Sequence, residues 1–136
     1  MIKTDPGVTL VLVSHSPDIA SGLAEMVGQI AGDGVPIVAV GGAVDGSLGT
    51  DGGRVLEVLR AAAADGGGVV LVDLGSSVLS VRAALNELSD QERDNLSVAD
   101  APLVEGAVAA AVAASTGCSH AEAARAAEEA RGVAKL

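Results

Sequence analysis

The sequence predicts an α/β protein with an open, mainly parallel four-stranded sheet and helices on both faces. Three observations support this fold class. Four short, almost wholly apolar runs are typical of strands that are covered on both faces. Each run is followed by a helical pattern, so that strands and helices alternate as in right-handed crossover units. The 136 residues contain no linker or repeat, so we expect a single domain over residues 1–136.

The four expected strands are rich in β-branched and aliphatic residues. They cover residues 8–13, 36–40, 69–74 and 96–99. A capping signal opens the first helix, because Ser16-Pro17-Asp18 combines a hydroxyl cap, a proline at the first helical position and an acid in the first turn. Further helices are expected from about residues 51, 75, 101 and 119, with a short helical turn after residue 89. The last helix, 119–132, has little apolar surface, and we expect it to be loosely packed.

Composition excludes several classes of function. The chain has 8 Lys and Arg against 18 Asp and Glu, a formal net charge of −10, and no Phe, Tyr or Trp. Nucleic acid is not expected as a partner, because it requires a basic surface and usually aromatic side chains for base stacking. No apolar run reaches the roughly 20 residues of a membrane span, and the first residues lack the pattern of a signal peptide. We therefore expect a soluble cytoplasmic protein without membrane contact.

The sequence indicates neither a metal ion nor an organic cofactor. Its single cysteine, Cys118, excludes an internal disulfide and a cysteine-based zinc site. No cluster of His, Asp and Glu has the spacing of metal ligands. The Gly-rich segment Gly41–Gly53 lacks the lysine-containing phosphate loop, and no GxGxxG motif follows the first strand. Tight nucleotide binding is therefore not expected there.

His15 follows the first expected strand, in the segment Ser14-His15-Ser16-Pro17. In α/β sheets, ligands bind at the carboxyl ends of the strands, where the strand order reverses. A neutral imidazole beside a helix N-terminus is suited to accept a phosphoryl group, because one ring nitrogen is the nucleophile and unpaired N–H groups stabilise the anion. The alternative is a loop histidine that makes only local hydrogen bonds.

Asp73 is the candidate for the second half of this site. It interrupts the apolar third strand near its end, where a carboxylate needs a partner to offset its desolvation. If the first and third strands are neighbours, Asp73 can accept a hydrogen bond from one nitrogen of His15 and leave the other nitrogen free to attack. The alternative role is capping of the helix that follows Asp73.

Hydroxyl groups along the same edge are candidates for phosphate contacts, although each alone is typical of turn or cap chemistry. They are Ser14, Ser16, Thr50, Ser76 and Ser77. Arg54 and Arg82 are the nearest arginines that helices at this edge could provide, with solvated surface as the alternative. His120 lies within the capping signal of the last helix and is expected to be solvated.

Four segments together resemble the mannose-type IIA domains of the bacterial phosphotransferase system. They are Leu12–Ser16, Gly49–Asp51, Val72–Ser77 and Ala101–Gly106. The resemblance covers about residues 8–115 and is strongest to the DhaM branch, the phosphocarrier subunits of dihydroxyacetone kinase. It implies an open α/β sheet, a homodimer and a phosphorylated histidine. Carried over to this chain, His15 is the phosphoryl acceptor and Asp73 orients it, with Thr50 and Ser76 or Ser77 as donors to the phosphate.

The resemblance also implies a phosphotransferase role. His15 would accept a phosphoryl group from the phosphocarrier protein HPr and pass it to ADP on the DhaL subunit, which phosphorylates dihydroxyacetone held by DhaK. One alternative is the IIA component of a mannose-type sugar transporter, which passes the group to a IIB domain. Another is a non-catalytic α/β binding or regulatory module. The Gly75-Ser76-Ser77 turn resembles the kinase branch, since mannose-type IIA domains tend to carry Trp-Gly-Gly-Ser there.

Overall fold

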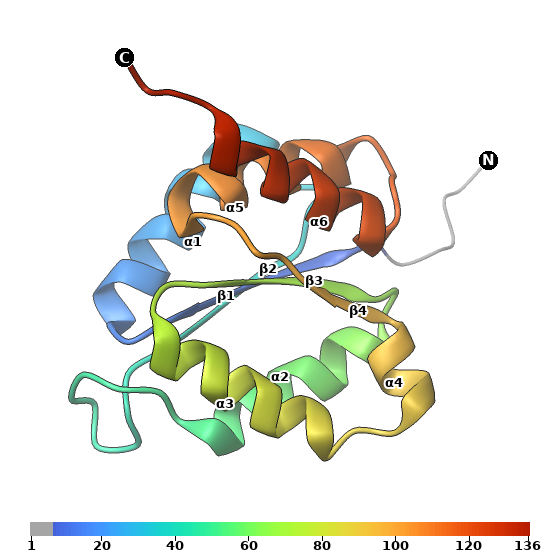
Figure 1. Ribbon diagram of the computed structural model, residues 1–136. Helices are drawn as coiled ribbons and strands as arrows, with labels where there is room; N and C mark the ends of the chain where they lie inside the picture. Colours follow the sequence, from blue (N-terminus) through green and yellow to red (C-terminus); the bar gives the residue numbers. More distant parts are fainter. Residues whose placement is uncertain (1–6) are drawn as a thin grey trace.

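Four parallel strands form one sheet in the order β2-β1-β3-β4 in the computed structural model, which describes residues 7–136 (Figure 1). The strands are β1 (Thr9–Ser14), β2 (Ile37–Gly41), β3 (Gly68–Val72) and β4 (Leu96–Val98). The central strand β1 pairs with β2 and β3, so that Leu12 lies opposite both Ala39 and Leu71. The predicted fold class is confirmed. The first six residues of the expected domain lie outside the described residues.

Helices cover both faces of this sheet (Figure 1). On one face lie α1 (Pro17–Ala31), α5 (Leu103–Ser115) and α6 (His120–Glu129), followed by a 3-10 turn, Ala130–Gly132. On the other face lie α2 (Gly52–Ala64), α3 (Gly75–Asn86) and the short α4 (Asp90–Asp94). Alternate side chains of a strand point to opposite faces, so Leu10 and Leu12 enter one core while Val11 and Val13 enter the other. All four side chains are inaccessible to solvent, as expected for a strand covered on both sides.

The strand order reverses between β1 and β3. The chain leaves β1 through α1 to reach β2, and it returns through α2 to place β3 on the opposite side of β1. The residues that follow these two neighbours, His15 and Asp73, therefore emerge side by side at the carboxyl edge. The backbone N–H of Asp73 still donates to the carbonyl of Val13, at 3.2 Å. The expected adjacency of the first and third strands is confirmed.

The third strand is shorter at its end than the apolar run suggested. We expected a strand through Leu74, but β3 ends at Val72. Asp73 lies just beyond the strand, where its carboxylate accepts from the His15 N–H, and Leu74 is the N-cap of α3. The Leu74 side chain is 64% exposed, unlike the buried valines before it.

The final helix is closely packed, which corrects the expectation of a loose one. Ala123, Ala124 and Ala127 of α6 are buried against the core beneath α5. A Cβ placed on Gly106 of α5 would lie only 3.6 Å from the Ala127 Cβ, so the two helices approach closely. Small side chains give this face little hydrophobicity, but they allow close packing and lose almost no conformational entropy on burial.

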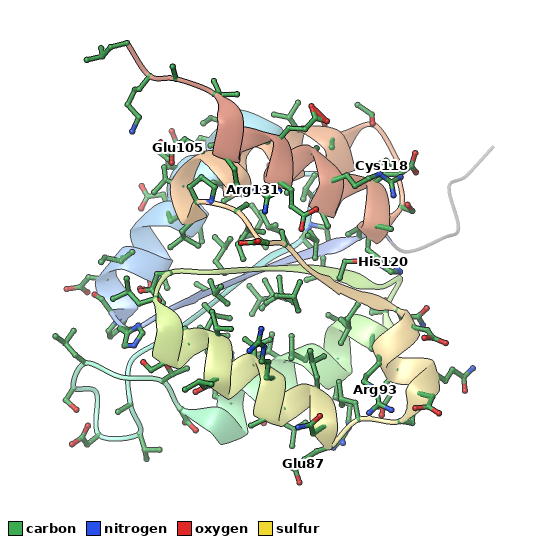
Figure 2. All side chains as sticks on the ribbon, viewed as in Figure 1. Glu87, Arg93, Glu105, Cys118, His120 and Arg131 are labelled. Atoms are coloured by element: carbon green, nitrogen blue, oxygen red, sulfur yellow. The ribbon has the colours of Figure 1, made fainter. Side chains whose placement is uncertain are left out.

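His120 is half-buried, which corrects the expectation of a solvated side chain. It lies where α6 begins, beside the sheet (Figure 2). Its Nδ1 is 2.7 Å from the Ser97 hydroxyl of β4, and its ring packs on Gly67, whose φ of +90° precedes β3. His120 therefore links α6 to the amino end of the sheet, the edge opposite to His15.

Gly41 allows the end of β2 to pass directly over the start of α1. A Cβ at this position would lie 2.5 Å from the Ser16 carbonyl oxygen and 2.9 Å from the Pro17 Cα. We expect Gly41→Ala to lower the free energy of unfolding by about 1–3 kcal/mol, because backbone atoms must move. Urea denaturation measures this, with Gly22→Ala as the control. Gly22 has open space around it within α1, so its replacement should instead stabilise the protein by about 0.5–1 kcal/mol. Equal effects of the two substitutions would contradict this packing.

Candidate active site

The Asp73 carboxylate is the centre of the site and accepts hydrogen bonds on both oxygens. Oδ2 accepts from the backbone N–H of His15 (2.9 Å) and from the Ser14 hydroxyl (2.8 Å). Oδ1 lies 2.9 Å from Nδ1 of His15, and it accepts from the Ser77 hydroxyl (2.9 Å) and the Leu74 N–H (2.6 Å). Asp73 is therefore held in one orientation by the last residue of β1, by His15 that follows it, and by the N-cap and first turn of α3.

These contacts determine the ionisation of Asp73. Burial by itself raises the pKa of this carboxyl, but the hydrogen bonds from the His15 backbone, Ser14, the His15 ring and Ser77 outweigh it. Together they hold the pKa of Asp73 well below its ordinary value of 3.8. The side chain is thus a carboxylate at neutral pH and can act only as a hydrogen-bond acceptor.

The charge of Asp73 assigns the proton on the His15 ring. Because a carboxylate cannot donate, the proton of this contact lies on Nδ1 of His15, and in the neutral form of the ring the lone pair is then on Nε2. Nε2 faces the hydroxyl of Ser76 at the exposed start of α3, and this hydroxyl donates to the lone pair. The His15 side chain is 22% exposed. It therefore presents one nucleophilic nitrogen at the surface and keeps the other on Asp73.

The structure divides the five candidate hydroxyls by role. The hydroxyls of Ser14 and Ser77 are fully buried and donate to Asp73, and that of Ser77 also lies 3.1 Å from His15 Nδ1. Their expected contact with phosphate stays a prediction. The Thr50 hydroxyl lies 3.2 Å from the Ser77 hydroxyl. Ser16 caps α1 by accepting a backbone N–H of its first turn. Only Ser76 adjoins the nucleophilic nitrogen.

Two helices begin beside His15, and they differ in their free N–H groups. α1 starts with Pro17, which has no N–H, and it is capped by Ser16. α3 starts at Gly75, and the side chain of its N-cap residue, Leu74, makes no capping bond. The first turn of α3 is therefore the one that offers unpaired N–H groups to an anion at Nε2.

Backbone contacts that sequence reasoning missed fix the position of His15 itself. The N–H of Gly49 donates to the His15 carbonyl (2.9 Å), and an isolated bridge joins Gly42 to Thr50 at the base of the same loop. The glycine-rich composition of this loop was visible in the sequence. Its contact with His15 was not, because it depends on how the loop folds back over the edge of the sheet.

The two candidate arginines lie apart from the imidazole. Arg54 is paired with Glu57 (2.6 Å) and lies in a groove near the amino ends of β1 and β2. Arg82 lines a separate cleft that begins at Asp73. Within residues 7–136, no group of three His, Cys, Asp or Glu side chains could hold a metal ion. No helix of this described part is long and apolar enough to cross a membrane.

The neighbouring serines of α3 should respond differently to replacement. Ser77→Ala removes a buried donor from Asp73, and we expect the free energy of unfolding to fall by about 1–3 kcal/mol. Ser76→Ala removes an exposed hydroxyl, so stability should change by less than about 0.5 kcal/mol. If His15 accepts phosphate, as the resemblance implies, the effect of Ser76→Ala should instead be a slower phosphorylation of His15. Urea denaturation measures the stability of each variant, and the initial rate of phosphate incorporation measures its phosphorylation. A larger loss of stability in Ser76→Ala than in Ser77→Ala would contradict these two roles.

Comparison with known proteins decides the family. Residues 9–124 match the family described as PTS system fructose IIA component (EIIA-man). The chain belongs to the EIIA-man family. Two curated relatives of this EIIA-man chain are DhaM subunits of dihydroxyacetone kinases. The phosphoryl donor subunit of kinase 2 from Listeria innocua is 39% identical over 77% of this chain and 84% of its own length. The phosphotransferase subunit from Lactococcus lactis is 36% identical over 74% of this chain and 77% of its own length.

Longer relatives and solved structures extend this comparison. The phosphoryl donor subunit DhaM of Escherichia coli is 34% identical over 81% of this EIIA-man chain, which matches only 24% of that protein. A crystal structure of a protein of unknown function is 34% identical, with a TM-score of 0.80 over 90% of this chain and 93% of its own. The mannose/sorbose-specific IIA subunit from Enterococcus faecalis, 22% identical with a TM-score of 0.56 over 98% of this chain and 97% of its own, shares the fold.

Proposed function

We propose that this protein is the phosphohistidine carrier of a PEP-dependent dihydroxyacetone kinase, with His15 as the phosphoryl acceptor. The observation that carries the proposal is the pairing of His15 Nδ1 with the Asp73 carboxylate, which leaves Nε2 as a nucleophile at the surface. The names of the relatives in Listeria and Lactococcus support the kinase branch of the family.

In the first step, the lone pair of His15 Nε2 attacks the phosphorus of phosphorylated HPr. The new N–P bond forms as the donor's N–P bond breaks, and that electron pair stays on the donor nitrogen. The imidazole of His15 gains positive charge as its lone pair is committed, and the Asp73 carboxylate stabilises that charge through the Nδ1 proton. No proton has to leave the ring during this step.

The phosphoryl group then rests beside the first turn of α3. The unpaired N–H groups of this turn and the Ser76 hydroxyl are the donors nearest to Nε2, and they favour the negative oxygens. Within residues 7–136, no Lys or Arg forms an ion pair with Asp73 or a hydrogen bond with His15, so we expect the phosphoryl group to be held loosely enough to be passed on. Loose retention suits a carrier whose product must leave on every cycle.

In the second step, the phosphoryl group moves to ADP bound on the acceptor subunit, DhaL. An oxygen of the terminal phosphate of ADP attacks the phosphorus, the P–Nε2 bond breaks, and its electron pair returns to the ring of His15. The ATP formed on DhaL then phosphorylates dihydroxyacetone on DhaK.

The expected homodimer of this chain stays a prediction, which light scattering of the purified protein tests.

A two-stage transfer experiment tests the proposed function. The protein is incubated with labelled phosphoenolpyruvate, enzyme I and HPr, and should gain phosphate that is stable in base and labile in acid. Labelled protein is then mixed with ADP-loaded DhaL, which should yield ATP. Transfer to a mannose-type IIB domain with no ATP formed would instead indicate the transporter role. Stable partner binding without any labelling would indicate a non-catalytic module.

A further inference from the structure

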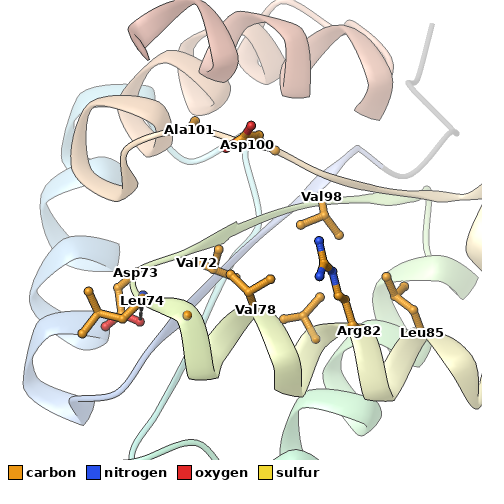
Figure 3. A pocket seen from close by; sticks show the side chains of 12 residues that line it. Val72, Asp73, Leu74, Val78, Arg82, Leu85, Val98, Asp100 and Ala101 are labelled. Atoms are coloured by element: carbon orange, nitrogen blue, oxygen red, sulfur yellow. Dashed lines mark hydrogen bonds between the residues drawn. The ribbon is translucent and has the colours of Figure 1, made fainter.

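A cleft of about 510 Å³ opens beside His15, between α3 and the edge strand β4 (Figure 3). Asp73, Leu74 and Gly75 line the end of the cleft nearest the site. Aliphatic side chains form most of its walls, with Val78 on α3 opposite Val98 at the end of β4. The cleft is therefore an apolar extension of the surface that surrounds the nucleophilic nitrogen.

Arg82 projects from α3 into this cleft, and its guanidinium points toward Val98 (Figure 3). Arg82 forms no ion pair within residues 7–136. Four of the other five arginines do form them, namely Arg54, Arg60, Arg93 and Arg131, and the fifth, Arg125, is exposed on α6 away from the cleft. The two carboxylates that line the cleft are already engaged, because Asp73 binds His15 and Asp100 binds Arg131 (2.7 Å). The positive charge in the cleft is therefore uncompensated in a chain whose net charge is −10.

An uncompensated arginine between aliphatic walls is suited to bind a carboxylate of another protein. The guanidinium can donate two parallel hydrogen bonds to a carboxylate. Apolar surroundings exclude water when a partner covers them, which strengthens the ion pair. Arginine is also among the residues that contribute most at interfaces, where it is typically surrounded by contacts that exclude water.

We propose that this cleft docks the acceptor subunit of the phosphoryl relay and that Arg82 binds a carboxylate of that subunit. The inference rests on the proposed function, because only a carrier has an acceptor. A partner whose ADP reaches Nε2 must cover Leu74 and Gly75, where the cleft begins. Along α3, Arg82 lies about 10 Å from Gly75, at about 1.5 Å per residue. An interface of ordinary size, about 800 Å² per partner, extends that far.

The charges around His15 assign the cleft to the acceptor rather than to the donor. Asp18 on α1, Asp45 on the loop after β2 and Asp51 at the start of α2 belong to elements that follow β1 and β2, whereas the cleft lies at the β3 and β4 side of the sheet order. These acids favour a basic partner surface and repel an anionic one. The acceptor brings the negative charge of ADP to the site, so its favourable approach is over α3, where Arg82 supplies a free positive charge. The donor brings only the one phosphoryl group that it transfers, whereas the acceptor brings the diphosphate of ADP to a site that already carries this group, so repulsion by the acidic side is weaker for the donor.

Charge reversal at Arg82 tests the proposal in the complete chain. The variant Arg82→Glu and the wild type are each phosphorylated through HPr, separated from the donor proteins, and mixed with increasing concentrations of ADP-loaded DhaL. We expect the half-saturating concentration of DhaL to rise by about tenfold or more in the variant. The initial rate of phosphorylation by HPr should change less than about twofold. Arg82→Lys keeps the charge but lacks the paired donors of the guanidinium. Its half-saturating concentration of DhaL should therefore lie between those of the wild type and Arg82→Glu.

Arg54→Glu is the matched control, because it makes the same charge change at an exposed helix position in a different groove. It should leave the dependence on DhaL unchanged. The proposal is overturned if Arg82→Glu has the same half-saturating concentration of DhaL as the wild type. It is also overturned if the rate of its phosphorylation by HPr falls as much as its transfer to DhaL. Failure of the proposed function gives a different result, since the wild type then gains no phosphate from HPr before DhaL is added.

Discussion

Replacing His15 with alanine is expected to reduce phosphorylation by phosphoenolpyruvate, enzyme I and HPr to background, a loss of at least about a hundredfold. The variant lacks the nitrogen whose lone pair attacks phosphorus, and no other side chain at this edge has the same activation. Ser76 is adjacent, but its hydroxyl has no base other than the missing imidazole. Acid-labile, base-stable label on the purified protein is the measurement.

His120→Ala is the control for this loss. His120 is the only other histidine of the chain, and it lies at the opposite edge of the sheet in contact with Ser97. Its removal should leave the labelling rate unchanged while lowering stability by about 1 kcal/mol through the lost hydrogen bond. Wild-type labelling of His15→Ala, or loss of label in His120→Ala, would show that the wrong histidine has been assigned.

Asp73→Asn should have the second largest effect, because the two side chains have nearly the same shape but different hydrogen bonding. An amide presents an NH2 group on one side, so it must face donors either at the His15 ring or at Ser14. In the first orientation the ring loses the acceptor that fixes its tautomer, and in both orientations it loses the negative charge that stabilises the charge developing on the ring. We expect phosphorylation of His15 to slow by about a hundredfold and the free energy of unfolding to fall by about 2 kcal/mol.

The stability contributed by Asp73 has a defined dependence on pH. The pKa of this carboxyl is lower in the folded protein than its ordinary value of 3.8, so the unfolded chain binds the proton more readily. The contribution is therefore fully present above about pH 5 and is lost as the pH falls through the folded-state pKa. Urea denaturation of wild type and Asp73→Asn should give a constant difference from neutral pH down to about 5, and a smaller one below about 4. A difference that grew with acid would contradict the hydrogen-bond network.

Most of the fold could be predicted because its strands are covered on both faces. β1 is buried at every position, and such strands appear in the sequence as continuous apolar runs. The end of β3 could not be predicted from the same signal, because Leu74 continues the apolar run although it faces solvent. The packing of α6 was also missed, since its buried residues are alanines, whose small side chains give little apolar signal in the sequence.

The contact between His15 and Asp73 was predictable from position, whereas the contacts of the hydroxyls were not. His15 and Asp73 each follow a strand, and the strand order brought them together. Whether a serine faces the phosphate or the carboxylate depends on the path of the turn after β3, which no local pattern specifies. For Ser14 the sequence did contain a signal of burial. Residues 10, 12 and 14 of a strand point to the same face, so Ser14 shares the buried face of Leu10 and Leu12.

Nitrogen-15 and phosphorus-31 NMR of the phosphorylated protein tests the assigned chemistry of His15 most directly. We expect one phosphorus signal coupled to Nε2 of His15, with Nδ1 retaining a proton that is protected from exchange by its bond to Asp73. Coupling to Nδ1, or phosphate on any other residue, would contradict the orientation of the ring by Asp73 and the role of Nε2 as the nucleophile.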